Sequence, residues 1–126
     1  MVSGMLAPIC SAMVYLHGLP VVHRDIKPSN VFCERAEDCS VKVVLADFGL
    51  AAHIMDKESM SSRCGTGGFV APEMFRNDWD RQLEEEAVAN VTKIDVFSFG
   101  MMVYATAFGE NPFIDTMLNS TYARNA

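Results

Sequence analysis

The chain has 126 residues, of which 50% are hydrophobic and 21% are charged. This composition is typical of a chain with a packed core and excludes a disordered one. Ten Lys and Arg stand against 16 Asp and Glu, so the formal net charge is −6. Because this balance offers no broad positive surface to a nucleic acid backbone or an anionic membrane, we expect neither as a partner.

The lack of a recognisable secretory signal and the spacing of the cysteines favour a location inside the cell. The uncharged start of the chain, residues 1 to 22, has no Lys or Arg ahead of its apolar part, unlike a secretory signal. The apolar run from Val96 to Gly109 has 14 residues, too few for a helix across a hydrocarbon core. Four spaced cysteines form no C-x-x-C pair, which favours reduced thiols in an intracellular, cytoplasmic protein. A bridge between Cys33 and Cys39 across a turn stays open, since four cysteines allow three pairings.

The first half of the chain predicts one helix and one hairpin. Apolar residues recur at the three-and-four spacing of a helix that ends at Gly18, and they are Met5, Leu6, Ile9, Met13, Val14 and Leu16. Val21 and Val22 begin a short extended piece. Residues 31 to 33 and 41 to 45 are rich in β-branched residues and predict two strands joined by the polar turn 34 to 40.

The second half combines a long loop, an acidic stretch and an apolar helix. Residues 46 to 71 lose all periodicity and gather Gly, Ser, His and Met, which is typical of a long irregular segment that carries function or is disordered. Residues 77 to 90 hold five acids and one Arg, so we expect a solvated surface helix or loop. Trp79 would pack within that stretch or anchor a partner. Residues 94 to 108 are apolar on nearly every side and predict a helix at the centre of the core.

Four motifs carry polar side chains suited to phosphate chemistry. His-Arg-Asp-Ile-Lys-Pro-Ser-Asn spans residues 23 to 30, and Asp-Phe-Gly follows the second predicted strand at residues 47 to 49. Gly-Thr-Gly-Gly occupies residues 65 to 68, and Ala-Pro-Glu occupies residues 71 to 73. In this order the motifs resemble the signature set of eukaryotic protein kinases: the catalytic loop, the metal-binding triplet and the triplet that closes the activation segment.

The resemblance also extends outside these motifs. Tyr-Leu-His at residues 15 to 17, the run from Asp95 to Gly100 and the run from Gly109 to Phe113 resemble the C-terminal lobe of the same family, so the resemblance covers residues 1 to 113. It implies an α+β fold: a partial kinase-like C-terminal lobe, mainly α-helical, with a short β-hairpin at the catalytic edge. The whole chain, residues 1 to 126, would be one partial kinase domain. No Gly-rich loop or strand Lys precedes the catalytic loop, so the N-terminal lobe and the last C-terminal helices are expected to be absent.

The resemblance assigns a role to each polar residue of the motifs. Asp25 would orient the substrate hydroxyl and accept its proton, and Lys27 would lie against the transferred phosphate of ATP. Asn30 and Asp47 would hold Mg²⁺ through oxygen ligands, which that ion prefers. Thr66 would bridge Asp25 and Lys27. The site would therefore use ATP and Mg²⁺ as cofactors.

Two further assignments concern substrate class and regulation. Lys-Pro-Ser at residues 27 to 29 is similar to serine/threonine kinases, whereas tyrosine kinases place Ala and Arg there. The resemblance also implies that Arg24 pairs with a phosphate on the activation segment, with Ser59, Ser61 and Ser62 as candidate acceptors. His23 and Phe48 would pack beneath the catalytic groups, and Asp95 would bond to the backbone of the catalytic loop.

Three functions remain open at this point. The first is phosphorylation of serine or threonine in protein substrates by a full-length form, with the isolated chain inactive because nothing covers its nucleotide. The second is a non-catalytic remnant of the lobe that acts as a binding or regulatory module. The third is a small-molecule phosphotransferase, against which the Ala-Pro-Glu triplet argues.

Overall fold

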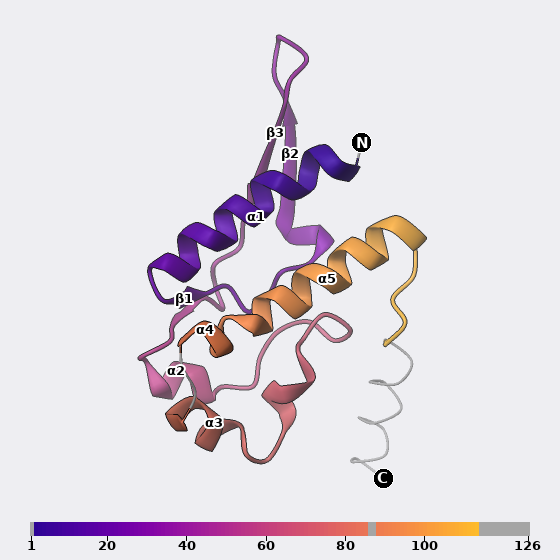
Figure 1. Cartoon of the computed structure of the whole chain (residues 1–126). Helices are drawn as coiled ribbons and strands as arrows, with labels where there is room; N and C mark the ends of the chain where they lie inside the picture. Colours follow the sequence, from indigo (N-terminus) through magenta and orange to yellow (C-terminus); the bar gives the residue numbers. More distant parts are fainter. Residues whose placement is uncertain (1, 86–87, 114–126) are drawn as a thin grey trace.

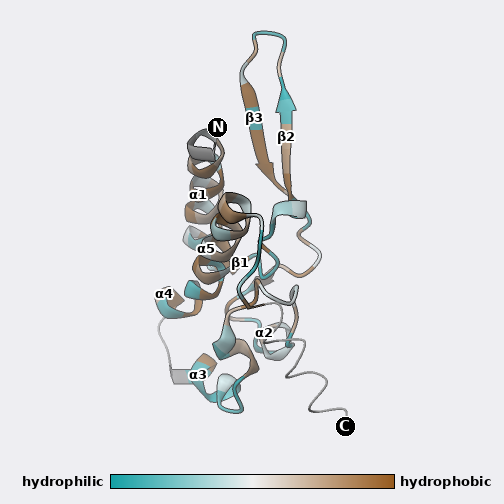
Figure 2. Cartoon of the chain, turned by 90° about the vertical axis from the view of Figure 1, so that its right-hand side faces the viewer, coloured by the Kyte–Doolittle hydropathy of each residue, from teal (hydrophilic) through white to brown (hydrophobic). Residues whose placement is uncertain are grey.

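The structure, a computed structural model, describes residues 2–85 and 88–113. Helices α1 and α5 lie side by side, and the short elements of the lower half gather beneath α5 (Figures 1 and 2). The helices are α1 (Val2–Gly18), α2 (Lys57–Ser61), α3 (Trp79–Glu85), α4 (Val88–Val91) and α5 (Lys93–Phe108), with 3₁₀ turns η1 (Pro28–Asn30) and η2 (Pro72–Phe75). The strands are β1 (Val21–Val22), β2 (Val31–Arg35), β3 (Val41–Leu45) and β4 (Ala52–His53).

Helix α1 confirms the predicted end at Gly18 and buries one narrow face. Ile9 and Met13 lie one turn apart and pack into a buried cluster with Met102 of α5. The prediction that Val14 belongs to the buried face is wrong, because its side chain is 73% exposed. Val14 lies next to Met13 along the helix, and one residue turns the side chain about 100° away from the core.

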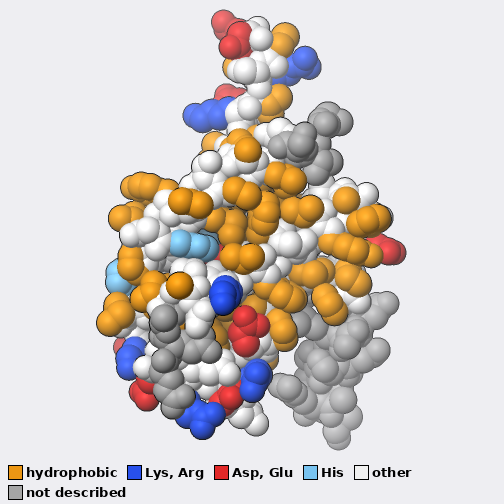
Figure 3. Space-filling model, viewed as in Figure 1, with side chains coloured by type: hydrophobic (Ala, Val, Ile, Leu, Met, Phe, Trp, Pro, Cys, Tyr) orange, Lys and Arg blue, Asp and Glu red, His pale blue; other side chains and the backbone are white. Residues whose placement is uncertain are grey.

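Helix α5 differs from its prediction in the same way. Ile94, Ser98 and Met101 face inward, whereas Val96 and Phe108 are 52% and 67% exposed. The helix therefore lies at the edge of the described core and not at its centre. Hydrophobic side chains gather on the face that α1 and α5 share in Figure 3, so the described part of the chain leaves apolar surface in contact with solvent.

The hairpin of β2 and β3 stands out from the helices (Figure 2). Its antiparallel register runs from Val31 opposite Leu45 to Arg35 opposite Val41, which confirms the predicted hairpin and lengthens its first strand. Cys33 faces Val43 within the ladder, and Cys39 lies in the turn beyond its last pair. All four cysteines are free, so the bridge between Cys33 and Cys39 is not formed.

The loop predicted over residues 46 to 71 contains regular structure. β4 pairs with β1 in an antiparallel two-stranded sheet, and α2 follows four residues later. The prediction of an irregular segment is therefore wrong for these two elements. Two-residue strands and a single helical turn depend on tertiary partners, and no local pattern reveals them.

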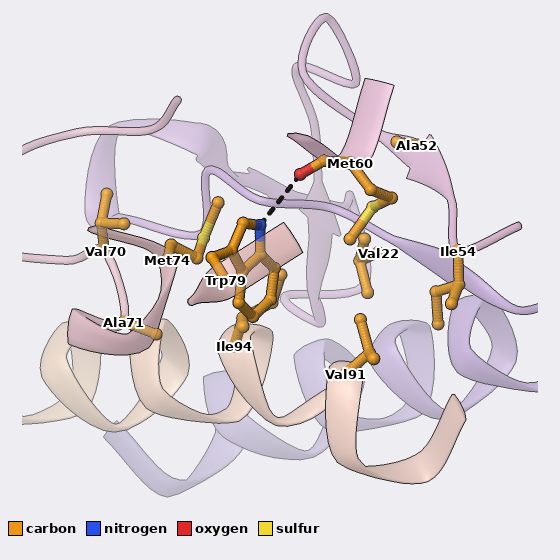
Figure 4. Close-up of a cluster of buried hydrophobic side chains, with 10 residues drawn as sticks. All are labelled: Val22, Ala52, Ile54, Met60, Val70, Ala71, Met74, Trp79, Val91 and Ile94. Carbon is orange, nitrogen blue, oxygen red and sulfur yellow. Dashed lines mark hydrogen bonds between the residues drawn. The ribbon is translucent and has the colours of Figure 1, made fainter. Parts of the chain in front are cut away.

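The acidic stretch is also more closely packed than expected. It forms α3, and the first residue of that helix, Trp79, is only 3% exposed. Trp79 packs in the main buried cluster with Met60, Met74 and Ile94, as Figure 4 shows. The expectation that Trp79 packs within its own stretch is wrong, because an indole buries more apolar surface against the core than a polar helix offers.

A helical run from Val88 to Phe108 has 21 residues and a mean hydropathy of 1.2, so its length and composition alone would allow it to cross a membrane. The sequence analysis considered only the apolar run from Val96 to Gly109, which is shorter because it leaves out α4 and the start of α5. Asp95 lies inside this run and is fully buried, with hydrogen bonds to the backbone of the loop after β1.

The Asp95 carboxylate joins three parts of the fold. Its Oδ2 accepts the backbone N–H of His23 at 2.8 Å, and its Oδ1 accepts that of Arg24 at 2.9 Å. Nε2 of His17, in the last turn of α1, lies 2.9 Å from Oδ2. One side chain of α5 therefore holds both the end of α1 and the loop after β1, and the expected bonds to that loop are present.

Replacing Asp95 should destabilise the chain strongly. In Asp95→Ala the two backbone N–H groups lose their acceptors inside the protein, at a cost of about 1–3 kcal/mol each. Asp95→Asn keeps one acceptor oxygen and should lie between the wild type and Asp95→Ala. Urea unfolding gives the free energy of each variant, with Asp80→Ala on the exposed face of α3 as the matched control. Equal stability of Asp95→Ala and Asp80→Ala would show that this carboxylate does not hold the fold.

Candidate active site

The loop after β1 carries the predicted catalytic residues, and apolar anchors fix both of its sides. Val22 and Ile26 are fully buried on either side of His23, Arg24 and Asp25. Arg24 has a φ of +66°, in the left-handed region that costs a residue with a side chain free energy. The bonds from His23 and Arg24 to Asp95 hold this conformation, and such strain is typical of functional sites.

His23 connects this loop to the Asp-Phe-Gly triplet. Its Nδ1 accepts the backbone N–H of Asp25 at 3.2 Å, so Nε2 carries the ring proton and donates to the carbonyl of Ala46 at 3.0 Å. The imidazole meets the ring of Phe48 edge-on, with 4.9 Å between ring centroids. His23 therefore lies beneath the site, where it fixes residues 46 to 48 relative to Asp25.

Asp25, Lys27 and Thr66 form one cluster although Thr66 lies 41 residues after Asp25. Lys27 Nζ donates to Thr66 Oγ1 at 2.7 Å, and the Thr66 hydroxyl donates to Asp25 Oδ1 at 2.6 Å. Lys27 Nζ also lies 3.1 Å from Asp25 Oδ2. The hydroxyl bridge that the sequence predicted between Asp25 and Lys27 is present, and it holds the partly exposed ammonium of Lys27 beside the buried carboxylate of Asp25.

Gly65 brings Thr66 to this position. Its φ is +115°, and a Cβ at Gly65 would lie 2.9 Å from the carbonyl of Arg24 and 2.5 Å from a methyl group of Val70. Only glycine allows the backbone to pass this close to the loop after β1. Asn111 supports the same loop further on, because its side-chain amide donates to the carbonyl of Gly68 at 2.8 Å.

Asn30 and Asp47 are held near each other through the backbone. The Ala46 N–H donates to the carbonyl of Asn30 at 2.9 Å, so Asp47 follows directly after the bond that joins the two segments. The amide nitrogen of Asn30 donates to the backbone carbonyl and to Oδ2 of Asp25, at 2.8 and 3.0 Å. Its amide oxygen is therefore the end that remains for a ligand.

The side-chain oxygens of Asn30 and Asp47 are suitable ligands for Mg²⁺. Asp47 is exposed, and one oxygen of its carboxylate accepts the N–H of Gly49 at 3.3 Å. Within residues 2–85 and 88–113, no three or more His, Cys, Asp and Glu side chains gather as a metal-binding group. A set of one carboxylate and one amide oxygen suits Mg²⁺, which keeps several waters and takes further ligands from substrate phosphates.

Arg24 contacts backbone oxygens of the segment that the sequence predicted to be regulatory. Its Nε donates to the carbonyl of Leu50 at 2.7 Å, and its Nη1 donates to that of Ser59 at 2.6 Å. The Ser59 hydroxyl donates to Asp56, whereas Ser61 and Ser62 are exposed. Hydrogen bonds from the Ser59 side chain and backbone hold the pKa of Asp56 below its usual range. Pairing of Arg24 with a phosphate on these serines stays a prediction.

Sequence reasoning missed three residues that shape the site. Gly65 was noted only as part of a motif, Asn111 only as part of the run from Gly109 to Phe113, and Trp79 was placed outside the site. The positive φ of Gly65 and the contact of Asn111 depend on pairs of residues that lie far apart in the chain. The signal available for Trp79 was its isolation in a polar stretch, which suits a buried anchor as well as a surface one.

Comparison with known proteins agrees with this geometry. The family model described as protein kinase domain matches residues 2–126. Serine/threonine-protein kinase chk-2 of Caenorhabditis elegans is 36% identical over 90% of this chain. Serine/threonine-protein kinase DCLK3 of Homo sapiens is 36% identical over 86% of the chain, and Myosin light chain kinase A of Dictyostelium discoideum is 35% identical over 88%.

The match covers most of this chain but a minor part of each relative. The chain spans 21% of the nematode kinase, 15% of the human kinase and 34% of the Dictyostelium kinase. The family is nevertheless shown over nearly the full length of the chain. The chain belongs to the protein kinase domain family, of the serine/threonine protein kinase type.

Proposed function

We propose that this chain forms most of the C-terminal lobe of an enzyme that transfers phosphate from ATP to serine or threonine hydroxyls of protein substrates. The cluster of Asp25, Lys27 and Thr66 carries the proposal. Phosphoryl transfer needs an aligned hydroxyl and stabilisation of phosphate charge, and a carboxylate beside an ammonium supplies both. A lobe kept only as a docking module has no need for this hydrogen-bonded arrangement.

Each residue of the cluster has a distinct task in the proposal. Asp25 orients the acceptor hydroxyl and takes its proton at a carboxylate oxygen. Lys27 holds a positive charge beside the transferred phosphate, and Thr66 keeps Lys27 and Asp25 in register. When bound, Mg²⁺ with ATP supplies the phosphoryl group, and Asn30 and Asp47 would hold the ion through their side-chain oxygens.

The first test replaces the proposed base in the native protein, isolated from its source cells or expressed from its complete coding sequence. Asp25→Asn removes the proton acceptor but keeps the side-chain size, so phosphate transfer to a mixed protein substrate should fall by at least about 100-fold. Asp38→Asn, in the exposed turn of the hairpin, is the matched control and should retain full activity. Equal transfer by the two variants would exclude Asp25 as the proton acceptor, and absence of transfer by the wild-type protein would favour the non-catalytic module.

The second test concerns the hydroxyl of Thr66. Thr66→Val keeps the shape but removes both hydrogen bonds, and lost bonds to charged groups cost about 1.5–3 kcal/mol. Rate loss should therefore be about 10- to 150-fold, and it should appear in kcat. Thr66→Ser keeps the hydroxyl and should stay within a few-fold of the wild type. A Thr66→Val enzyme as fast as Thr66→Ser would remove this bridge from the proposal.

The third test concerns the isolated 126-residue chain, whose site lies open to solvent. Asp47 and Phe48 are exposed, the latter by 48%, and the described residues do not enclose a nucleotide between them. A ligand at 100 times its Kd adds about 2.7 kcal/mol to stability, which a thermal melt detects easily. We expect no such shift with millimolar Mg²⁺ and ATP on the isolated chain. A clear shift that Asp47→Asn abolishes would show that the lobe binds nucleotide alone.

A further inference from the structure

Helix α2, the short helix in the middle of the activation segment, is attached to α3 through Trp79. The indole N–H of Trp79 donates to the carbonyl of Met60 at 3.0 Å, and the bond is buried. The Met60 side chain is fully buried in the cluster that also contains Trp79, and it lies next to Val22 in Figure 4. Met60 and Trp79 are therefore joined by a buried hydrogen bond within one apolar cluster.

Arg24 holds the other side of the same helix. Its Nη1 donates to the carbonyl of Ser59 at 2.6 Å and lies 3.4 Å from that of Ser62. These carbonyls belong to the end of α2, where a helix leaves oxygens that need further donors. The Ser59 carbonyl accepts one weak bond within the segment, from the backbone N–H of Ser62 at 3.3 Å. Asp56 caps the opposite end by accepting the backbone N–H of Ser59 at 3.2 Å. Side chains from the catalytic loop, from α3 and from the segment itself thus fix α2 together.

We propose that Trp79 is a positioning residue that, together with Arg24, docks α2 and so orders the activation segment in protein that carries no phosphate. The consequence for catalysis rests on the proposed function. Thr66 follows Ser62 by four residues, and Gly65 passes directly against the Arg24 backbone. Movement of α2 would therefore pull on the short connection that places Thr66 beside Asp25.

In this arrangement the acidic stretch, residues 77 to 90, supplies the indole that docks α2. Its first helix carries the indole, and its exposed acids keep the remaining surface of that helix in water. Lys57 of α2 lies 3.7 Å from Glu84 of α3, an exposed pair that adds little energy. The docking depends on Trp79, because the indole fills the cluster and satisfies the buried carbonyl of Met60 in one contact.

Limited proteolysis tests the docking without any use of catalysis. Lys57 is the first residue of α2, Arg63 lies two residues after its end, and both are exposed. Lys42 in the hairpin offers trypsin an internal control site. Trp79→Phe keeps an aromatic ring but leaves the Met60 carbonyl without its donor, a cost of about 1–3 kcal/mol. In the phosphatase-treated 126-residue chain, cleavage after Lys57 and Arg63 should rise roughly 5- to 100-fold, whereas cleavage after Lys42 should not change.

A second variant covers the case in which Trp79→Phe weakens the whole fold. Trp79 is the single tryptophan of the chain, so its fluorescence reports on this contact alone. Arg24→Lys keeps Trp79 but loses the forked donors, and it should raise both the quenching of Trp79 by acrylamide and cleavage after Lys57. Unchanged cleavage and quenching in Arg24→Lys would overturn the proposal.

Phosphate is the alternative source of order in this segment. If phosphatase treatment of the wild type raised cleavage after Lys57 and Arg63 to the level of the Trp79→Phe chain, a phosphate and not Trp79 would order α2, and the proposal would fail. In the native enzyme, Trp79→Phe should lower kcat and leave the KM for ATP unchanged. An inactive native protein would contradict the proposed function, while the protease result would still decide the docking.

Discussion

One buried carboxylate, that of Asp95, constrains how α1, α5 and the loop after β1 are arranged. Asp95 is fully buried, and a charge in that position is tolerated only when donors surround it. The donors come from His17 at the end of α1 and from the backbone of His23 and Arg24. Because the three donors lie more than 70 residues before Asp95 in the chain, only a tightly limited arrangement of α1, α5 and the loop after β1 satisfies them all.

The strained backbone of the site depends on this constraint. Arg24 and Asp47 both have positive φ values, +66° and +61°, which neither residue would keep in a loose loop. Asp95 fixes the first through the backbone, and His23 carries the effect to the second through the Ala46 carbonyl and the Phe48 ring. Asp25 and Asp47 thus keep their relative positions because a residue far from both of them is held in the core.

The sequence predicted those parts of the fold that local pattern determines. Helix α1 and the hairpin follow from periodicity and turn composition, which act over a few residues. The pairing of β1 with β4 and the single turn of α2 were missed because each is too short to persist without partners elsewhere in the chain. The exposed face of α5 was missed for another reason. Composition shows that a helix is apolar, but neighbours decide which of its sides they cover.

The candidate site likewise has a part that the sequence predicts, the residue types of its polar cluster, and a part that it does not, the contacts that hold this cluster in place. The residue types at Asp25, Lys27 and Thr66 could be predicted because few side chains perform phosphate chemistry, and resemblance supplied their order. The supporting contacts could not be predicted from the sequence. Arg24 and Trp79 both donate to backbone carbonyls of α2, and because every residue has a backbone carbonyl, residue type does not reveal the acceptor. The sequence shows which side chains can donate a hydrogen bond, but it does not show which backbone carbonyl accepts it. Support of this kind therefore becomes visible only when the fold is known, even where the candidate catalytic residues can be proposed from the sequence.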